Sequence, residues 1–167
     1  MNNKKPTLQN LIESLKLGYI NKDITNENFP DDGRLLTDSK VFDFNKLISS
    51  EEAIAEMKKD GYIPANLREM LFWAKDNWDN KNWVTALGSV YRHWHVGRGV
   101  PCLWRDAGGR GLYLGAFADG WDDGFRFLAV RESAALGHLE VGSLESLEAR
   151  LLELEKDMEK IKKFLII

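Results

Sequence analysis

The 167-residue sequence has one cysteine, Cys102, and no asparagine after Asn82. A single cysteine excludes an internal disulfide and a cage of thiolate metal ligands, so we expect a buried structural thiol. No stretch reaches the roughly 18 apolar residues of a membrane-spanning helix, and the polar N-terminus shows no signal peptide. The formal net charge of −3 lacks the basic excess typical of nucleic-acid binding. We predict neither a membrane span nor a nucleic-acid partner, and the localisation stays open.

Signatures of catalysis are missing as well. No serine lies between residues 91 and 131, and Cys102 has no base at a recognisable spacing. Gly108 and Gly109 lack a following phosphate-binding lysine, so they predict a hairpin turn. His93 and His95 have no third ligand at a diagnostic spacing. The sequence therefore predicts no enzyme, no cofactor and no metal site.

Apolar periodicity divides the chain into four parts. Residues 1–37 predict an N-terminal helix and linker, with a short helix over 7–17 and a polar loop or linker over 21–33 that has little to bury. Residues 38–132 predict one α+β domain. Its expected elements are a strand at 40–46, a helix from the Ser49 cap to about Asp60, a helix that starts near Pro64 with this proline in its first turn, a buried central strand at 83–90, and antiparallel strands at 100–104, 111–117 and 125–130.

A linker at 133–142 precedes the clearest periodicity of the sequence, at 143–167. Apolar residues there alternate at spacings of three and four. They are Leu144, Leu147, Leu151, Leu154, Met158, Ile161 and Leu165. This heptad pattern, with Leu144 at position a, predicts a parallel coiled coil, whereas an amphipathic helix packed on its own domain is the alternative.

The charges beside this seam favour self-association. Arg150 and Asp157 fall at g positions, and Glu155 and Lys162 fall at the e positions that a parallel partner brings opposite them. Leu and Met at a, with Leu and Ile at d and no buried asparagine, favour a trimer or tetramer over a dimer.

The segment 91–131 has an unusual composition. It contains no Asn, Lys, Glu, Gln, Met, Ile, Ser or Thr, although ordinary surface loops are rich in several of these. Its Tyr, Trp, His, Arg, Asp and Gly residues on turns are typical of recognition loops. Trp104 and Trp121 are expected in the core, because aromatic residues at strand positions are usually buried. We interpret the rest of the segment as a contact surface.

The framework of this region resembles the variable proteins of diversity-generating retroelements over residues 38–131. The resemblance is carried by 83–90 (WVTALGSV), 100–103 (VPCL), 110–114 (RGLYL), 120–121 (GW) and 126–131 (RFLAVR). It implies a C-type-lectin-like fold, and residues 125–127 (FRF) are similar to the closing strand of formylglycine-generating-enzyme-like members. The order of a strand, two helices and then strands agrees with that fold.

In such systems a reverse transcriptase substitutes adenines of a repeat, which would remove asparagine and lysine codons. Tryptophan is not reachable from an asparagine codon in this way, so Trp94, Trp104 and Trp121 would be fixed framework. The resemblance then implies a set of diversified, ligand-contacting positions. They are Tyr91, His93, His95, Arg105, Asp106, Gly111, Tyr113, Ala118, Asp119, Asp122, Asp123 and Phe125.

The sequence thus predicts an oligomeric display protein that binds a protein or other macromolecular ligand through 91–125. Clustering of several sites by the coiled coil would raise avidity. The alternative is an invariant structural or adhesion subunit of a phage or cell-surface assembly.

Overall fold

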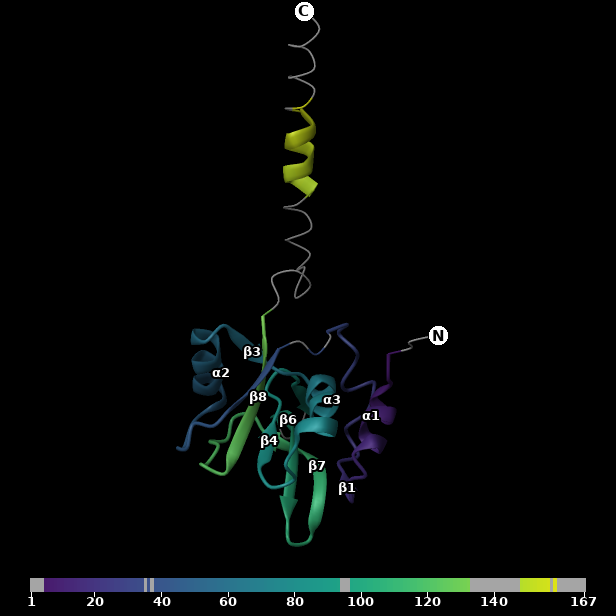
Figure 1. Cartoon of the computed structure of the whole chain (residues 1–167), viewed down its shortest axis with the longest axis vertical. Coiled ribbons are helices and arrows are strands. Elements are labelled where there is room, and N and C mark those ends of the chain that lie inside the picture. Colours follow the sequence, from purple (N-terminus) through teal and green to yellow (C-terminus); the bar gives the residue numbers. More distant parts are fainter. Residues whose placement is uncertain are drawn as a thin grey trace, which may run out of the picture. The chain divides into compact units, whose positions relative to one another are not determined.

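The computed structural model of the chain describes residues 5–34, 36, 38–93, 97–132, 148–156 and 158. Contacts divide the chain into two compact units, Met1–Glu132 and Ser133–Ile167 (Figure 1). The first unit is mixed α+β, as predicted. Its elements are α1 (Leu8–Ser14), β1 (Tyr19–Ile20), β2 (Ser39–Phe42), α2 (Ser50–Lys59), β3 (Tyr62–Pro64), α3 (Leu67–Asn77), β4 (Trp83–Thr85), β5 (Tyr91–His93), β6 (Gly97–Asp106), β7 (Gly109–Ala116) and β8 (Phe125–Arg131).

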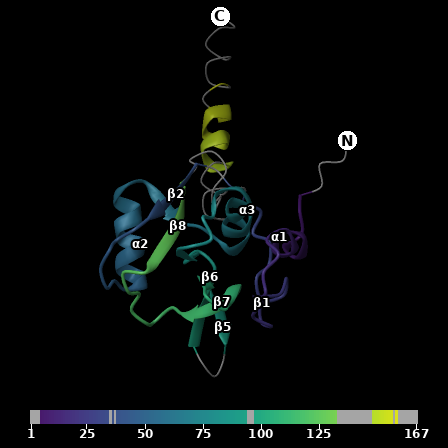
Figure 2. The ribbon, with the colours of Figure 1, turned by 60° about the horizontal axis from the view of Figure 1, so that its bottom comes forward.

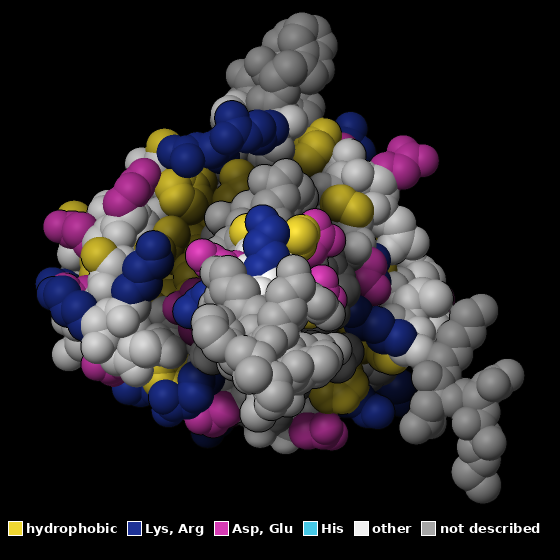
Figure 3. All heavy atoms as spheres, turned by 90° about the horizontal axis from the view of Figure 1, so that it is seen from above, with side chains coloured by type: hydrophobic (Ala, Val, Ile, Leu, Met, Phe, Trp, Pro, Cys, Tyr) yellow, Lys and Arg dark blue, Asp and Glu magenta, His cyan; other side chains and the backbone are white. Residues whose placement is uncertain are grey.

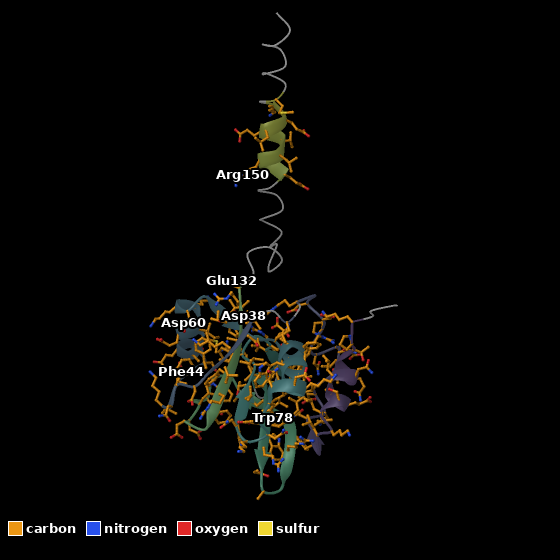
Figure 4. All side chains as sticks on the ribbon, viewed as in Figure 1. Asp38, Phe44, Asp60, Trp78, Glu132 and Arg150 are labelled. Atoms are coloured by element: carbon orange, nitrogen blue, oxygen red, sulfur yellow. The ribbon has the colours of Figure 1, made fainter. Side chains whose placement is uncertain are left out.

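The described strands form one eight-stranded sheet in the order β1-β7-β6-β4-β8-β2, with β5 added to β6 and β3 to β8. Most pairs are antiparallel, as predicted, but β4 pairs with β8 in parallel, and so does β1 with β7. The last strand, β8, lies between β4 and β2. The beginning of β2 and the end of β8 meet, because the Arg131 amide donates to the Asp38 carbonyl, and Figure 4 shows Asp38 beside Glu132.

The predicted cap of α2 is confirmed. The Ser49 hydroxyl accepts from the Glu52 amide at 3.1 Å, and the Glu52 carboxylate accepts from the Ser49 amide at 3.1 Å. These bonds satisfy two amides that the first turn of a helix leaves free. Lys58 and Lys59 lie in the last turn, where they complement the partial negative charge of the helix end.

α3 begins near Pro64, as predicted, but the expected place of Pro64 in its first turn was wrong. Pro64 ends β3 and pairs with Ala129, and the helix begins after the cap residue Asn66. The Asn66 side chain accepts from the Glu69 amide, while Glu69 accepts from the Asn66 amide, each at 2.8 Å. This capping box two residues later stabilises the helix start better than the fixed φ of proline.

The predicted strand at 83–90 is central but shorter than expected. β4 ends at Thr85, although Ala86 and Leu87 remain buried. The chain then turns at Gly88, whose amide donates to the Ala65 carbonyl at 2.9 Å. A Cβ at Gly88 would overlap the carbonyl oxygen of Pro64, so this close approach requires glycine.

Two hydrophobic clusters cover opposite faces of the sheet. On one face, α1 and α3 pack over β4, β6, β7 and β8 through residues such as Leu11, Met70 and Leu103. On the other face, α2 packs through Ala53 and Met57. Figures 1 and 2 show α2 on one side of the sheet and α1 with α3 on the other.

The loop over 21–33 buries more than predicted. Ile24 and Phe29 are buried in the cluster of α1 and α3. The expectation of little to bury was therefore wrong, because these two apolar side chains anchor an otherwise polar loop.

Trp121 joins the β7–β8 loop to the start of α2. Its backbone exchanges two hydrogen bonds with Ile48, at 2.8 and 2.9 Å. The Trp121 indole donates to the Ser50 hydroxyl at 2.8 Å, and that hydroxyl donates to the Phe117 carbonyl at 2.7 Å. Trp121 is 3% exposed, which confirms that it is a core residue.

In the second unit the structure describes a helical segment at 148–156 and 158. Leu151, Leu154 and Met158 are each about 60% exposed in the single chain. The linker at 133–142 and the seam residues Leu144, Leu147, Ile161 and Leu165 lie outside the described residues. No helix within the described ranges is long and apolar enough to cross a membrane.

Replacing Ser50 with alanine should destabilise the first unit by about 1–3 kcal/mol, because it removes partners from the buried Trp121 indole and Phe117 carbonyl. Urea unfolding followed by tryptophan fluorescence measures the change. Lys58→Ala, at an exposed position of the same helix, is the control and should cost less than about 0.5 kcal/mol. Equal stability of the two variants would contradict the role of this network.

Candidate ligand-binding surface

Four aromatic side chains form a partly exposed surface on the α2 face of the sheet. Trp83, Trp104, Tyr113 and Phe125 come from β4, β6, β7 and β8, and each is half-buried. The Trp83 ring lies 5.2 Å from the Phe125 ring and 6.1 Å from the Tyr113 ring, both edge-on. These four residues are called the aromatic surface below.

Buried contacts hold the aromatic surface in place. The Trp83 indole donates to the Arg105 carbonyl at 3.0 Å, which ties β4 to β6. The Phe125 ring lies 4.9 Å from the buried Trp121 ring. Trp121 fits over β7 because position 115 is glycine, where a Cβ would lie 2.8 Å from the indole. The rings therefore stand on a rigid part of the sheet.

Beneath Tyr113 lies a small polar group made by Cys102 and Thr85. The Cys102 sulfur is 3.3 Å from the Thr85 hydroxyl and is fully buried, as predicted for a structural thiol. Burial raises the pKa of the Cys102 thiol to about 11, so it is neutral at neutral pH and a poor nucleophile. Burial also raises the pKa of Tyr113, and the proximity of Cys102 and of the Asp122 carboxylate adds to that shift.

Most of the predicted contact residues lie on or near the hairpin of β6 and β7 and the loop that follows it. Tyr113 and Phe125 belong to the aromatic surface, and Asp122 is close enough to Tyr113 to influence its charge. The remaining exposed members are Arg105, Asp106, Ala118, Asp119 and Asp123. Gly108 forms the predicted hairpin turn, in which its amide donates to the Asp106 carboxylate at 2.7 Å.

The predicted residues of β5 lie elsewhere. Tyr91 packs on the α1 and α3 face, with its ring 6.0 Å from Phe29. It lines a separate cavity of about 170 Å³ together with Asn21, Asp23 and Arg98. His93 is the last residue of β5, and His95, like Trp94, lies outside the described residues.

Gly111 is buried and has no room for a side chain. A Cβ there would lie 2.7 Å from the Trp104 indole nitrogen and 2.8 Å from the Tyr19 carbonyl. The glycine therefore allows β1 and the Trp104 ring to approach β7, which differs from the ligand contact predicted for it.

Sequence reasoning did not include Trp83 and Trp104 in the contact surface. Trp104 was expected in the core, but the structure leaves it half-buried beside Gly111. The pairing of the two strands could have indicated that Trp104 and Tyr113 share a face. In this antiparallel hairpin Trp104 lies opposite Gly111, and Cys102 lies opposite Tyr113.

Within the described ranges, no group of three or more His, Cys, Asp or Glu residues could hold a metal ion. Charged side chains of both signs are interspersed with hydrophobic ones on the face drawn in Figure 3.

The chain matches no protein-family model, no curated protein and no solved structure.

Gly111→Ala should destabilise the first unit by about 1–3 kcal/mol, because the new methyl group overlaps the Trp104 indole and the Tyr19 carbonyl. Thermal unfolding and the tryptophan emission maximum are the measurements. Gly18→Ala is the matched control, since its Cβ would make an ordinary 3.5 Å contact with the Arg110 carbonyl at the same sheet edge. Unchanged stability and emission in Gly111→Ala would refute the steric argument.

Proposed function

We propose that the chain is a non-enzymatic ligand-binding display protein with a C-type-lectin-like domain, diversified by a retroelement and oligomerised by its C-terminal helix. The observation that carries the proposal is the aromatic surface. Many protein-binding sites consist of half-exposed aromatic residues on a rigid support, bordered by exposed turn residues.

The element order supports the proposed fold. β2 is followed by α2, the short strand β3 and α3, and then by the strands β4 to β8. The unusual composition of 91–131 supports the diversification, because the exposed side chains on the hairpin and the loop are those that an altered asparagine codon can supply.

Geometry narrows the set of diversified positions. Asp106, Ala118, Asp119, Asp122 and Asp123 are exposed, and Tyr113 and Phe125 are half-buried on the aromatic surface. These positions, with His93 and His95, remain in the proposed set. Gly111 does not, because it lacks room for a side chain. Tyr91 and Arg105 do not, because they lie on the opposite face.

We further propose that the exposed seam at Leu151, Leu154 and Met158 is covered by the same seam of other copies. An isolated helix of this length is marginally stable in water, and burial of its apolar residues in a parallel trimer or tetramer would stabilise it. Several copies of the aromatic surface would then bind one target with increased avidity.

Deep sequencing of this gene across a natural population of its source, with its flanking DNA, tests the diversification. We expect variation at adenine positions of a nearby template, in the codons of the proposed set, and constant codons for Gly111 and Trp121. A uniform gene that drifts without a template would overturn the proposal and favour the invariant structural subunit.

The double variant Leu151→Lys/Leu154→Lys should convert an oligomer to a monomer, because it places charges at a and d positions of the seam. Sedimentation velocity of the full chain measures the mass. Leu152→Lys, an equally exposed leucine at a b position, should leave the oligomer intact. A wild-type chain that is monomeric at micromolar concentration would refute the coiled coil.

A further inference from the structure

The polar end of one ring in the aromatic surface already has a partner inside the protein. The Trp83 indole nitrogen donates to the Arg105 carbonyl. This N–H group is therefore occupied and cannot serve as a free donor to a ligand. What remains is the π-system of the rings, which attracts cations.

The nearby arginine side chains face other groups. Arg105 pairs in register with Arg110, and Arg110 donates to the Asn80 side chain at 2.6 Å, after the end of α3. Because paired residues share a face, both arginines lie on the side of α1 and α3, away from the aromatic surface. Arg126 forms an ion pair with Asp43 at 3.0 Å and donates to the Asp123 carbonyl at 2.8 Å, so its donors are used by the Asp43 carboxylate and by the loop backbone rather than by the Asp122 carboxylate.

Arg98 lies at the other end of β6. It stacks over the Phe117 ring at 4.1 Å and is 3.7 Å from the Glu51 carboxylate. Its position along the strand places it about 20 Å from Trp104. The partners of Arg98 are therefore Phe117 and Glu51, and it lies far from the Trp104 end of the aromatic surface.

Asp122 supplies negative charge at the border of this surface. It directly follows Trp121, and its carbonyl accepts from the Phe125 amide at 3.3 Å. One carboxylate oxygen accepts from the Gly124 amide at 2.8 Å, which fixes the side chain and leaves further lone pairs exposed. Asp123, next to it, is also exposed.

We infer that the aromatic surface of this chain binds an arginine or lysine side chain of a protein ligand, with the cation over the rings and against the Asp122 carboxylate. The inference rests on the proposed binding function and names the chemistry of its target. Partly exposed aromatic rings beside carboxylate acceptors match a cationic group that only donates, such as a guanidinium or ammonium.

The test titrates N-acetylated, C-amidated octaarginine into the full chain at low salt, with the indole NMR signals of Trp83 and Trp104 as readout. We expect these signals to shift on binding. Asp122→Asn should weaken binding about threefold, since it removes the charge and keeps an acceptor for the Gly124 amide. Phe125→Ala should weaken binding by a similar factor. Urea unfolding of each variant checks that the fold is retained.

Asp76→Asn is the matched control, because it removes one exposed charge from α3, on the opposite face. Its binding of octaarginine should equal that of the wild-type chain. An equal loss in Asp76→Asn and Asp122→Asn would mean general attraction to a chain of net charge −3, and would overturn the inference. Shifts of the same indole signals by octaglutamate or by a neutral oligosaccharide, with none by octaarginine, would overturn it too.

Selection of peptides from a random library against the full chain separates this inference from the proposed function. Recovered peptides should carry basic residues and should lose binding to Phe125→Ala. Peptides that need Phe125 but lack basic residues would overturn the cationic chemistry alone. Peptides that bind elsewhere, indifferent to Phe125, would overturn the proposed binding surface as well.

Discussion

The hydrogen-bonded indole of Trp121 is the interaction on which the rest of the first unit depends. It connects the start of α2, through Ser50, to the carbonyl of Phe117 at the end of β7. The backbone bonds to Ile48 close the same junction. Because the indole is buried, every one of these polar groups needs its partner. The loop between β7 and β8 is thereby fixed at its middle, while its exposed residues stay free to differ.

The two faces of the sheet follow from this arrangement. α1 and α3 cover one face, and the polar loop over 21–33 adds Ile24 and Phe29 to the same cluster. On the other face α2 contributes Ala53 and Met57 near β2 and β8. The aromatic surface lies on that same face, at the side chains of β4, β6, β7 and β8 that remain half-buried.

Structural features that depend on residues close together in the chain could be predicted from the sequence. The α2 cap at Ser49 and Glu52 and the hairpin turn at Gly108 were predicted from residues three apart or fewer, and the structure contains both. Gly111 was misjudged because its neighbour Tyr19 is ninety-two positions away, in a strand of only two residues. The face on which Tyr91 packs likewise depends on a distant residue, because its ring lies 6.0 Å from that of Phe29. Contacts between residues far apart in the chain produce no characteristic spacing in the sequence from which they could be predicted.

The position of β8 has a consequence for the reading frame. This strand follows the segment 91–125 in the chain, yet it lies between β4 and β2 in the sheet. A frameshift or stop codon within that segment would replace or remove β8. It would leave β2 and β3 without their partner strand and one edge of β4 unpaired. Such a product could not complete its sheet. Only in-frame sequences of this segment are therefore compatible with folding of the complete sheet.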